Sequence, residues 1–249
     1  MAGFSQGEAN WWYFGSNAGV HFNPNPVAVT GGQINTIEGV ASISDAAGNL
    51  LFYTDGLTVY TKNHTTMANG TGLMGDPSSS QSAIIVQRPG SSTLYYIFTA
   101  SLATSTNGFR YSVVDMTLNG GLGAITAQKN IPLYQPTTER ICAVRHCNNT
   151  DIWIISHHWG TNEFRSYLLS STGLSATPVT SNAGTVNTGN SAMSIGYLKA
   201  APDGNRLAMV MRYTPSGSTA SIVELYDFSN TTGVVSNAVN LGGGFNYGY

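Results

Sequence analysis

The stretch V-A-S-I-S-D-A-A-G-N-L-L-F-Y-T-D-G-L-T-V-Y, residues 40–60, contains three short runs of β-branched, aliphatic and aromatic residues. The turn residues D-A-A-G-N (45–49) and D-G (55–56) separate these runs. Short apolar runs bounded by Asp, Asn and Gly are typical of antiparallel strands joined by tight turns. The pattern therefore predicts a small three-stranded sheet. We interpret Asp45 and Gly48 as turn formers rather than site residues, because Asp accepts backbone N–H bonds and Gly adopts positive φ.

The same order of strand, polar turn and very apolar strand recurs three more times along the chain. The apolar second strands begin near Leu50, Leu94, Ile152 and Leu207, so they follow one another at broadly similar intervals. Similar repeats of three or four strands are typical of propeller blades, which stack because one small sheet cannot bury both faces. The sequence predicts an all-β protein, a β-propeller with WD40-like blades. The alternative is a β-sandwich of about a dozen strands.

The repeats also predict the domain organisation. We expect one β-propeller domain, or a fragment of one, over residues 1–249. It would comprise an N-terminal strand segment, 10–22, and blade-like repeats at about 38–75, 82–130, 139–178 and 193–241. Four repeats are few for a ring. The ring is therefore either incomplete or closed by the N-terminal strand.

Composition excludes several classes of protein. Charged residues make up 9% of the 249 residues, and the ten Lys and Arg are scattered, which excludes a nucleic-acid binder. No apolar run reaches about 18 residues, so no membrane-spanning helix is expected. The first residues lack a basic start and an apolar stretch, so we read them as a mature N-terminus with an added Met. The other reading is a cytoplasmic protein that begins at Met1.

Several longer strings carry a resemblance to a known family. They are N-W-W-Y-F-G-S-N-A-G-V-H-F (10–22), residues 38–56, S-S-S-Q-S-A-I-I-V (78–86), G-Y-L-K-A-A-P-D-G-N-R-L-A (196–208) and Y-D-F-S-N-T-T-G-V-V-S-N (226–237). Together they resemble the N-terminal propeller-like region of large secreted Bacteroidetes surface proteins, which are gliding-motility and type IX secretion substrates. The resemblance implies export, a place on the cell surface or in the medium, and further domains in a larger parent chain. It supplies no catalytic residues, and the sorting domain that ends those proteins is missing from this sequence.

Two glutamates are the best candidates for catalysis. Glu38 and Glu139 both precede a first strand of a repeat, and first strands of a propeller line its central channel. Two carboxylates across a glycosidic bond are the groups of a glycosidase. A sialidase-like site would also need clustered arginines, and the arginines here do not recur at one position of the repeats.

Aromatic side chains are the candidates for ligand binding, since their faces stack on sugar rings. They are Trp11 and Trp12 near the start and Trp159 after an apolar strand, with His157 beside it. Packing between blades is the competing interpretation of the aromatic cluster at 11–14. Adjacent histidines 157 and 158 on a strand point to opposite faces, so a shared metal is not expected.

The two cysteines and the acidic loop residues leave alternatives open. Cys142 and Cys147 form a small-loop disulfide if the protein is exported, or stay as free thiols. A metal site would need a second cysteine pair. Calcium would have to use loop carboxylates such as Asp55, Asp76 or Asp115, but no D-x-D-x-D-G run supports it. We therefore expect no metal and no cofactor.

These observations predict a non-enzymatic, secreted or cell-surface module for adhesion that binds a glycan or a protein partner. A glycosidase or sialidase-like hydrolase on the same scaffold is the alternative. A purely architectural spacer within a giant adhesin is a third possibility.

Overall fold

The computed structural model of the chain describes residues 7–22, 24–213 and 220–242. Strands dominate these residues, and the helical segments among them are three short 3-10 turns, η1 (Gly7–Ala9), η2 (Asn119–Gly121) and η3 (Ser191–Ser194). None of these segments is long or apolar enough to cross a membrane. The prediction of an all-β chain is confirmed.

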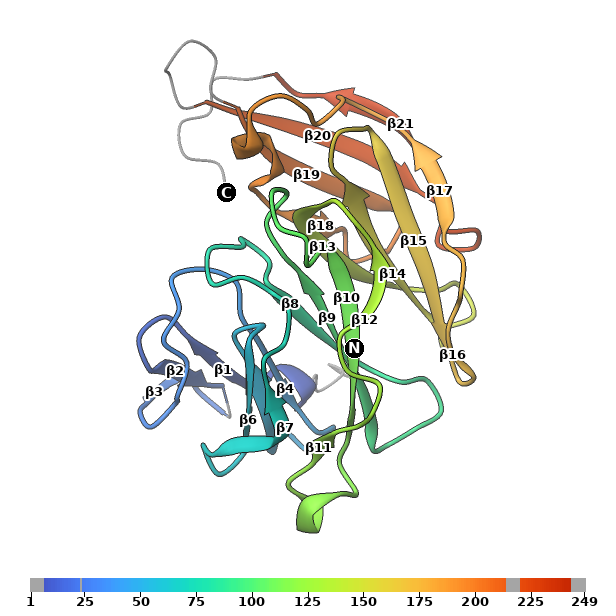
Figure 1. Cartoon of the computed structure of the whole chain (residues 1–249). Coiled ribbons are helices and arrows are strands. Elements are labelled where there is room, and N and C mark those ends of the chain that lie inside the picture. The colour runs from blue at the N-terminus through green and yellow to red at the C-terminus, as the bar shows by residue number, and fades with distance from the viewer. Residues whose placement is uncertain (1–6, 23, 214–219, 243–249) are drawn as a thin grey trace.

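The first two sheets form one end of the molecule, shown in blue and cyan in Figure 1. Both are antiparallel and follow chain order. The first consists of β1 (Trp11–Phe14), β2 (Ala18–His21) and β3 (Val27–Val29). The second consists of β4 (Ala41–Ser44), β5 (Leu50–Thr54), β6 (Thr58–Thr61) and β7 (Thr66–Thr71).

The next set of strands is joined to the second sheet through one parallel contact, Ala124 of β11 opposite Ala68 of β7. The result is a nine-stranded sheet. The added strands are β8 (Ala83–Gln87), β9 (Leu94–Ala100), β10 (Phe109–Asp115), β11 (Ala124–Ile125) and β12 (Ile131–Tyr134).

Two further antiparallel sheets complete the described chain and lie at the upper end of Figure 1, in green to red. One contains β13 (Thr137–Arg145), β14 (Ile152–His158), β15 (Glu163–Ser170), β16 (Gly173–Leu174) and β17 (Val179–Asn182). The other contains β18 (Leu198–Ala200), β19 (Arg206–Tyr213), β20 (Ala220–Phe228) and β21 (Val235–Asn240).

The turns between the first and second strands form as the sequence predicts. The Asp45 carboxylate accepts the Asn49 backbone N–H at 2.8 Å, and Gly48 adopts φ of 86°. At the corresponding turn before β19, Asp203 accepts the Asn205 N–H at 3.0 Å and Gly204 has φ of 70°. These acidic residues therefore fix hairpins.

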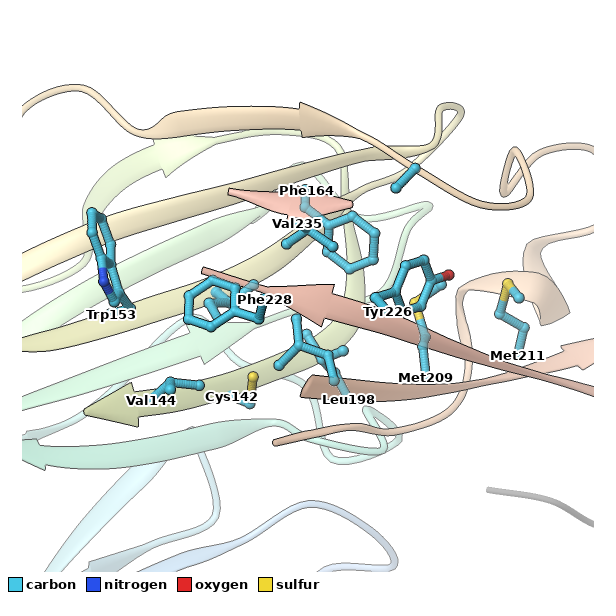
Figure 2. Packing of buried hydrophobic residues seen from close by; sticks show 13 residues of the cluster. Cys142, Val144, Trp153, Phe164, Leu198, Met209, Met211, Tyr226, Phe228 and Val235 are labelled. Carbon is cyan, nitrogen blue, oxygen red and sulfur yellow. The ribbon is translucent and has the colours of Figure 1, made fainter. Parts of the chain in front are cut away.

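The core lies between neighbouring sheets, and the strands β5, β9, β14 and β19 contribute fully buried side chains to it. Phe52 of β5, Ile97 of β9, Ile154 of β14 and Met209 of β19 are fully buried. One cluster joins the last two sheets, where Phe164 of β15 meets Tyr226 of β20 edge to face at 4.9 Å (Figure 2). Burial on both faces explains why these strands are apolar throughout.

The first strands of successive sheets lie beside one another. Neighbours in this series are β1 and β4, β4 and β8, β8 and β13, and β13 and β18. A cavity of about 670 Å³, here called the central hollow, opens against the series. Its lining residues are Trp12, Tyr13, Phe14, Val40, Ala41, Ser42, Ala83, Ile84, Ile85 and Lys199. Strands from the first and the last described sheets therefore face the same space.

Candidate functional site

Strand β1 presents two aromatic rings to the central hollow. Side chains alternate along a strand, and Trp12 and Phe14 share the exposed face, with 53% and 39% of their surface accessible. The Trp12 ring makes an edge-to-face contact with Phe22, with ring centroids 5.0 Å apart, which orients the indole. An exposed and oriented indole of this kind is suited to stacking on a flat apolar ligand face.

The opposite face of β1 is used for packing. Tyr13 is buried and stacks on Tyr53 at 4.4 Å. Trp11 stacks on His21 at 4.0 Å and donates its indole N–H to the Gly48 carbonyl at 3.1 Å. Of the two predicted ligand-binding tryptophans, Trp12 is therefore the one that is available, and Trp11 has a structural role.

The two predicted carboxylates lie close enough to interact. Glu38 lies three residues before the start of β4, and its pKa is raised by burial and by the negative charges of Glu139 and Asp76, while Arg212 opposes the shift. One carboxylate oxygen of Glu38, Oε2, is buried without a hydrogen-bond partner among the described atoms. A carboxyl that stays protonated above its usual pKa is suited to donate a proton.

Glu139 has a more enclosed environment. It is 1% exposed, and its Oε2 accepts both the backbone N–H and the hydroxyl of Ser80 at 2.8 Å. Burial raises its pKa, and the hydrogen bonds from Ser80 partly offset the shift. A small cavity of about 170 Å³, which Ser191 and Ser194 also line, reaches this carboxylate.

Local backbone geometry places both carboxylates beside the segment 79–82, outside the lining of the central hollow. The register between β13 and β14 shifts between Thr137 and Ile141, so the strand is irregular at Glu139. Such irregularities re-aim side chains. Before β4, Gly39 donates its N–H to the Ser79 carbonyl at 3.0 Å, and a Cβ at Gly39 would overlap the backbone nitrogen of Ser82. Only glycine allows this approach.

The segment Ser80–Gln81, which leads into β8, makes hydrogen bonds to β13 and to the segment that begins β18. Gln81 donates to the Ile141 carbonyl at 2.8 Å, and its Oε1 accepts the Leu198 N–H at 2.7 Å. The Ser80 hydroxyl also accepts the Gly196 N–H at 3.2 Å. These bonds join the lead-in of β8 to β13 and to β18, which fixes the positions of the first strands around the hollow.

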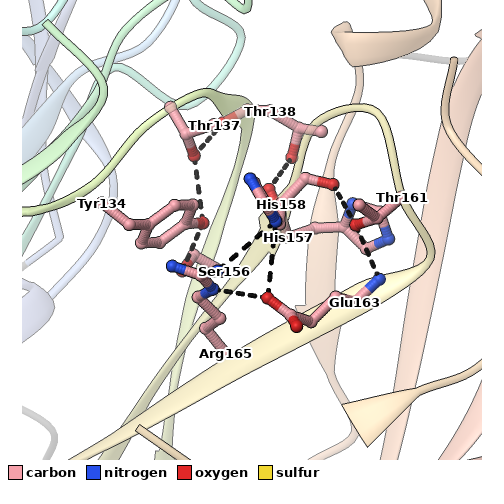
Figure 3. Close-up of polar contacts among 9 residues, drawn as sticks. All are labelled: Tyr134, Thr137, Thr138, Ser156, His157, His158, Thr161, Glu163 and Arg165. Atoms are coloured by element: carbon pink, nitrogen blue, oxygen red, sulfur yellow. Dashed lines mark hydrogen bonds and ion pairs between the residues drawn. The ribbon is translucent and has the colours of Figure 1, made fainter. Parts of the chain in front are cut away.

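His157 is not available to a ligand, contrary to the prediction. Its side chain is fully buried against Phe164 at 4.8 Å, and burial holds its pKa well below the usual value. The physical reason is the alternation of β14, which turns residue 157 inward and residue 158 outward. His158 contacts Glu163 at 3.4 Å (Figure 3).

Figure 3 also shows that the surroundings of His158 are a structural polar cluster. Arg165 pairs with Glu163 at 2.6 Å and lies over the Tyr134 ring at 4.4 Å. Trp159 follows as a turn residue of intermediate exposure, and its backbone N–H donates to the Pro136 carbonyl. His157 therefore lies on a different sheet from Trp12, and Trp159 lies in the turn that follows β14.

The disulfide between Cys142 and Cys147 is absent, which corrects that prediction. Both cysteines are free: Cys142 is buried and Cys147 is exposed. Cys142 lies within the extended strand β13, which continues to Arg145. An extended chain rises about 3.3 Å per residue, so the two Cα atoms exceed the roughly 7 Å limit for a bridge. Burial raises the pKa of the Cys142 thiol to about 12.

The three loop carboxylates considered for calcium are engaged in local turns. Asp55 accepts the Thr58 N–H at 2.7 Å, Asp76 accepts the Ser78 N–H at 2.9 Å, and Asp115 accepts the Thr117 N–H at 2.9 Å. In the described ranges, no group of three His, Cys, Asp or Glu side chains is placed to hold a metal ion.

Sequence reasoning missed three residues of this site. Ser80 and Gln81 stand in a string that was noticed only for its family resemblance, and their role depends on contacts with segments distant in the sequence. Lys199 is the third, and it lines the hollow from the last sheet. The one feature of the sequence that could have indicated this role was the position of Lys199 in the first strand of a repeat.

Comparisons with known proteins give distant structural similarities. No family model and no curated protein matches the sequence. A triple mutant of AofleA from Arthrobotrys oligospora is 10% identical, with 96% of this chain and 75% of that chain covered and a TM-score of 0.42. The α-L-arabinofuranosidase PaAbf62A from Podospora anserina, in complex with cellotriose, is 12% identical, with 95% and 70% covered and a TM-score of 0.36. Neither similarity assigns a function to this chain.

The prediction of a non-enzymatic module is nevertheless corrected by this finding. One of the similar structures, PaAbf62A, is an α-L-arabinofuranosidase. The two carboxylates are considered on their own geometry.

Proposed function

We propose that the chain is a β-propeller that binds a glycan in the central hollow, with Trp12 as its stacking platform. The single observation that carries this proposal is the exposed Trp12–Phe14 face on the wall of the hollow. A cavity of about 670 Å³ is large enough for one or two sugar rings.

Two features support the propeller arrangement. The repeats follow one another in chain order, with β8–β12 joined to β4–β7 in one nine-stranded sheet, and the first strands of the repeats neighbour one another. A sandwich would instead place two broad sheets face to face. Export and a cell-surface location, with type IX secretion, belong to the same proposal and rest on the family resemblance alone. A protein ligand is the alternative partner.

Replacing Trp12 with alanine is expected to weaken glycan binding by several-fold to about tenfold, because an aromatic pair contributes about 0.5–1.5 kcal/mol beyond the area that it buries. The measurement is a glycan array followed by calorimetric titration of the best ligand. Trp159→Ala is the matched control and should bind as the wild type does. Equal affinity of the wild type and Trp12→Ala would contradict the proposal.

Glycoside hydrolysis is the second candidate function, and the coupled carboxylates favour it. Glu38, whose Oε2 has no hydrogen-bond partner among the described atoms, would act as the acid, and Glu139, which accepts two hydrogen bonds from Ser80, would act as the carboxylate. Two carboxyl groups in unequal environments are the arrangement that separates acid from base.

Glu38→Gln is expected to reduce hydrolysis of the bound glycan by at least about a hundredfold, the usual contribution of a general acid. The rate of the wild type should fall as pH rises through the raised pKa of Glu38, because the acid must be protonated. Reducing-sugar release measures both effects, with Glu163→Gln as control. No release from any ligand found on the array would remove this candidate and leave the binding proposal intact.

A further inference from the structure

The central hollow carries a single charged side chain. Among its described lining residues, Lys199 is the one that is charged, and the others are aromatic, aliphatic or small apart from Ser42. The wall is therefore apolar on the side of β1, β4 and β8, and cationic on the side of β18.

The Lys199 ammonium has no anionic partner among the described residues. The described ion pairs join His158 and Arg165 to Glu163, and Arg206 to Asp227. The ammonium lies over the face of the Tyr197 ring, at 5.1 Å from its centroid. This contact orients the lysine but leaves its N–H donors free to bind an acceptor.

Other groups at the hollow suit a sugar ring. The Ser42 hydroxyl accepts the Tyr13 N–H at 3.1 Å and keeps its own proton for donation. Glu38, whose charge raises the pKa of Tyr197, is not among the residues that line the hollow. The site thus combines a stacking platform, a hydroxyl donor and one cation.

We propose that Lys199 makes the hollow selective for anionic sugars, with a hexuronate as the preferred unit. A pyranose ring that carries a carboxylate has an apolar face for Trp12 and one negative charge for Lys199. Lys199 is exposed, so salt screens the attraction, and we expect it to set the preference among ligands more than the overall affinity. A sulfate ester offers the same charge on the same ring. This inference rests on the proposed glycan-binding function and adds the class of ligand.

The test compares trigalacturonate with its methyl ester, which has the same sugar rings but carries no negative charge. Calorimetric titration should show the wild type binding the acid about tenfold or more tightly than the ester. Lys199→Gln should bring the two affinities together, Lys199→Arg should keep the preference, and the exposed Lys62→Gln should behave as the wild type. Raising the salt concentration should weaken binding of the acid and leave binding of the ester unchanged.

A sulfated trisaccharide distinguishes the two sources of negative charge. If the wild type binds this ligand more tightly than trigalacturonate, and Lys199→Gln removes the difference, the result supports anion selectivity and assigns the preference to sulfate esters. Equal binding of acid and ester by the wild type, still lost in Trp12→Ala, overturns the inference and leaves glycan binding standing. Failure of every glycan on the array to bind overturns the proposed function itself.

Discussion

Replacing Arg140 with methionine is expected to lower the free energy of unfolding by about 3–5 kcal/mol, the usual cost of breaking a buried charged network. Arg140 is fully buried, and burial lowers its pKa to about 10, so it stays protonated at neutral pH. Its guanidinium donates to the carbonyls of Val210 at 2.9 Å and Ile195 at 2.7 Å, to that of Met193, and to Asn187 Oδ1 at 2.9 Å.

The expected loss of stability follows from the position of these hydrogen bonds, which connect β13 to β19 and to the segment before β18. Methionine fills similar space but leaves the carbonyls buried without donors. Urea unfolding followed by tryptophan fluorescence measures the change. Arg206→Met, at a largely exposed arginine 3.6 Å from Asp227, is the control and should cost less than about 1 kcal/mol. An Arg140→Met variant as stable as the Arg206→Met control would contradict this account of the connection.

Replacing Phe164 with alanine is expected to destabilise the protein by about 3–5 kcal/mol, the usual range for a buried phenylalanine. Phe164 is fully buried where β15 faces β20, and it contacts Tyr226 at 4.9 Å (Figure 2). Removing the ring leaves a cavity between the last two sheets, which their facing side chains cannot fill.

Graded substitution separates the cavity from other effects. Phe164→Leu keeps most of the volume and should cost less than Phe164→Ala, and Leu118→Ala, at a residue that is 42% exposed, should be nearly neutral. Urea midpoints give all three values. If Phe164→Ala were no worse than Leu118→Ala, the two sheets would not be packed as described.

Much of the fold could be predicted from local pattern. The apolar runs at 50–54 and 152–156 are buried strands, and the turns at Asp45 and Asp203 form as expected. Period-two alternation and turn chemistry are local signals, so one sequence suffices for them. The parallel contact between β7 and β11 joins segments that are far apart in the sequence, and no local sequence pattern predicts it.

The site could be predicted only in part. Trp12 and the pair Glu38 and Glu139 were found from residue type and position along the repeats. The prediction that His157 contacts a ligand was wrong. Alternation along a strand places neighbouring side chains on opposite faces, but the sequence does not show which of the two faces inward. Lys199 and Gln81 acquire their roles from neighbours that other parts of the chain supply, and sequence spacing contains no information on those contacts.

The most direct test of the account follows the indole N–H signals of the four tryptophans by NMR during titration with the glycan that binds best. The Trp12 signal should shift on binding, because that ring is exposed at the central hollow. The signals of Trp11 and Trp153, whose indole N–H groups are bonded to the Gly48 and Asn230 carbonyls, should shift little. A shift of Trp159 alone, with Trp12 unchanged, would place the ligand elsewhere and contradict the account.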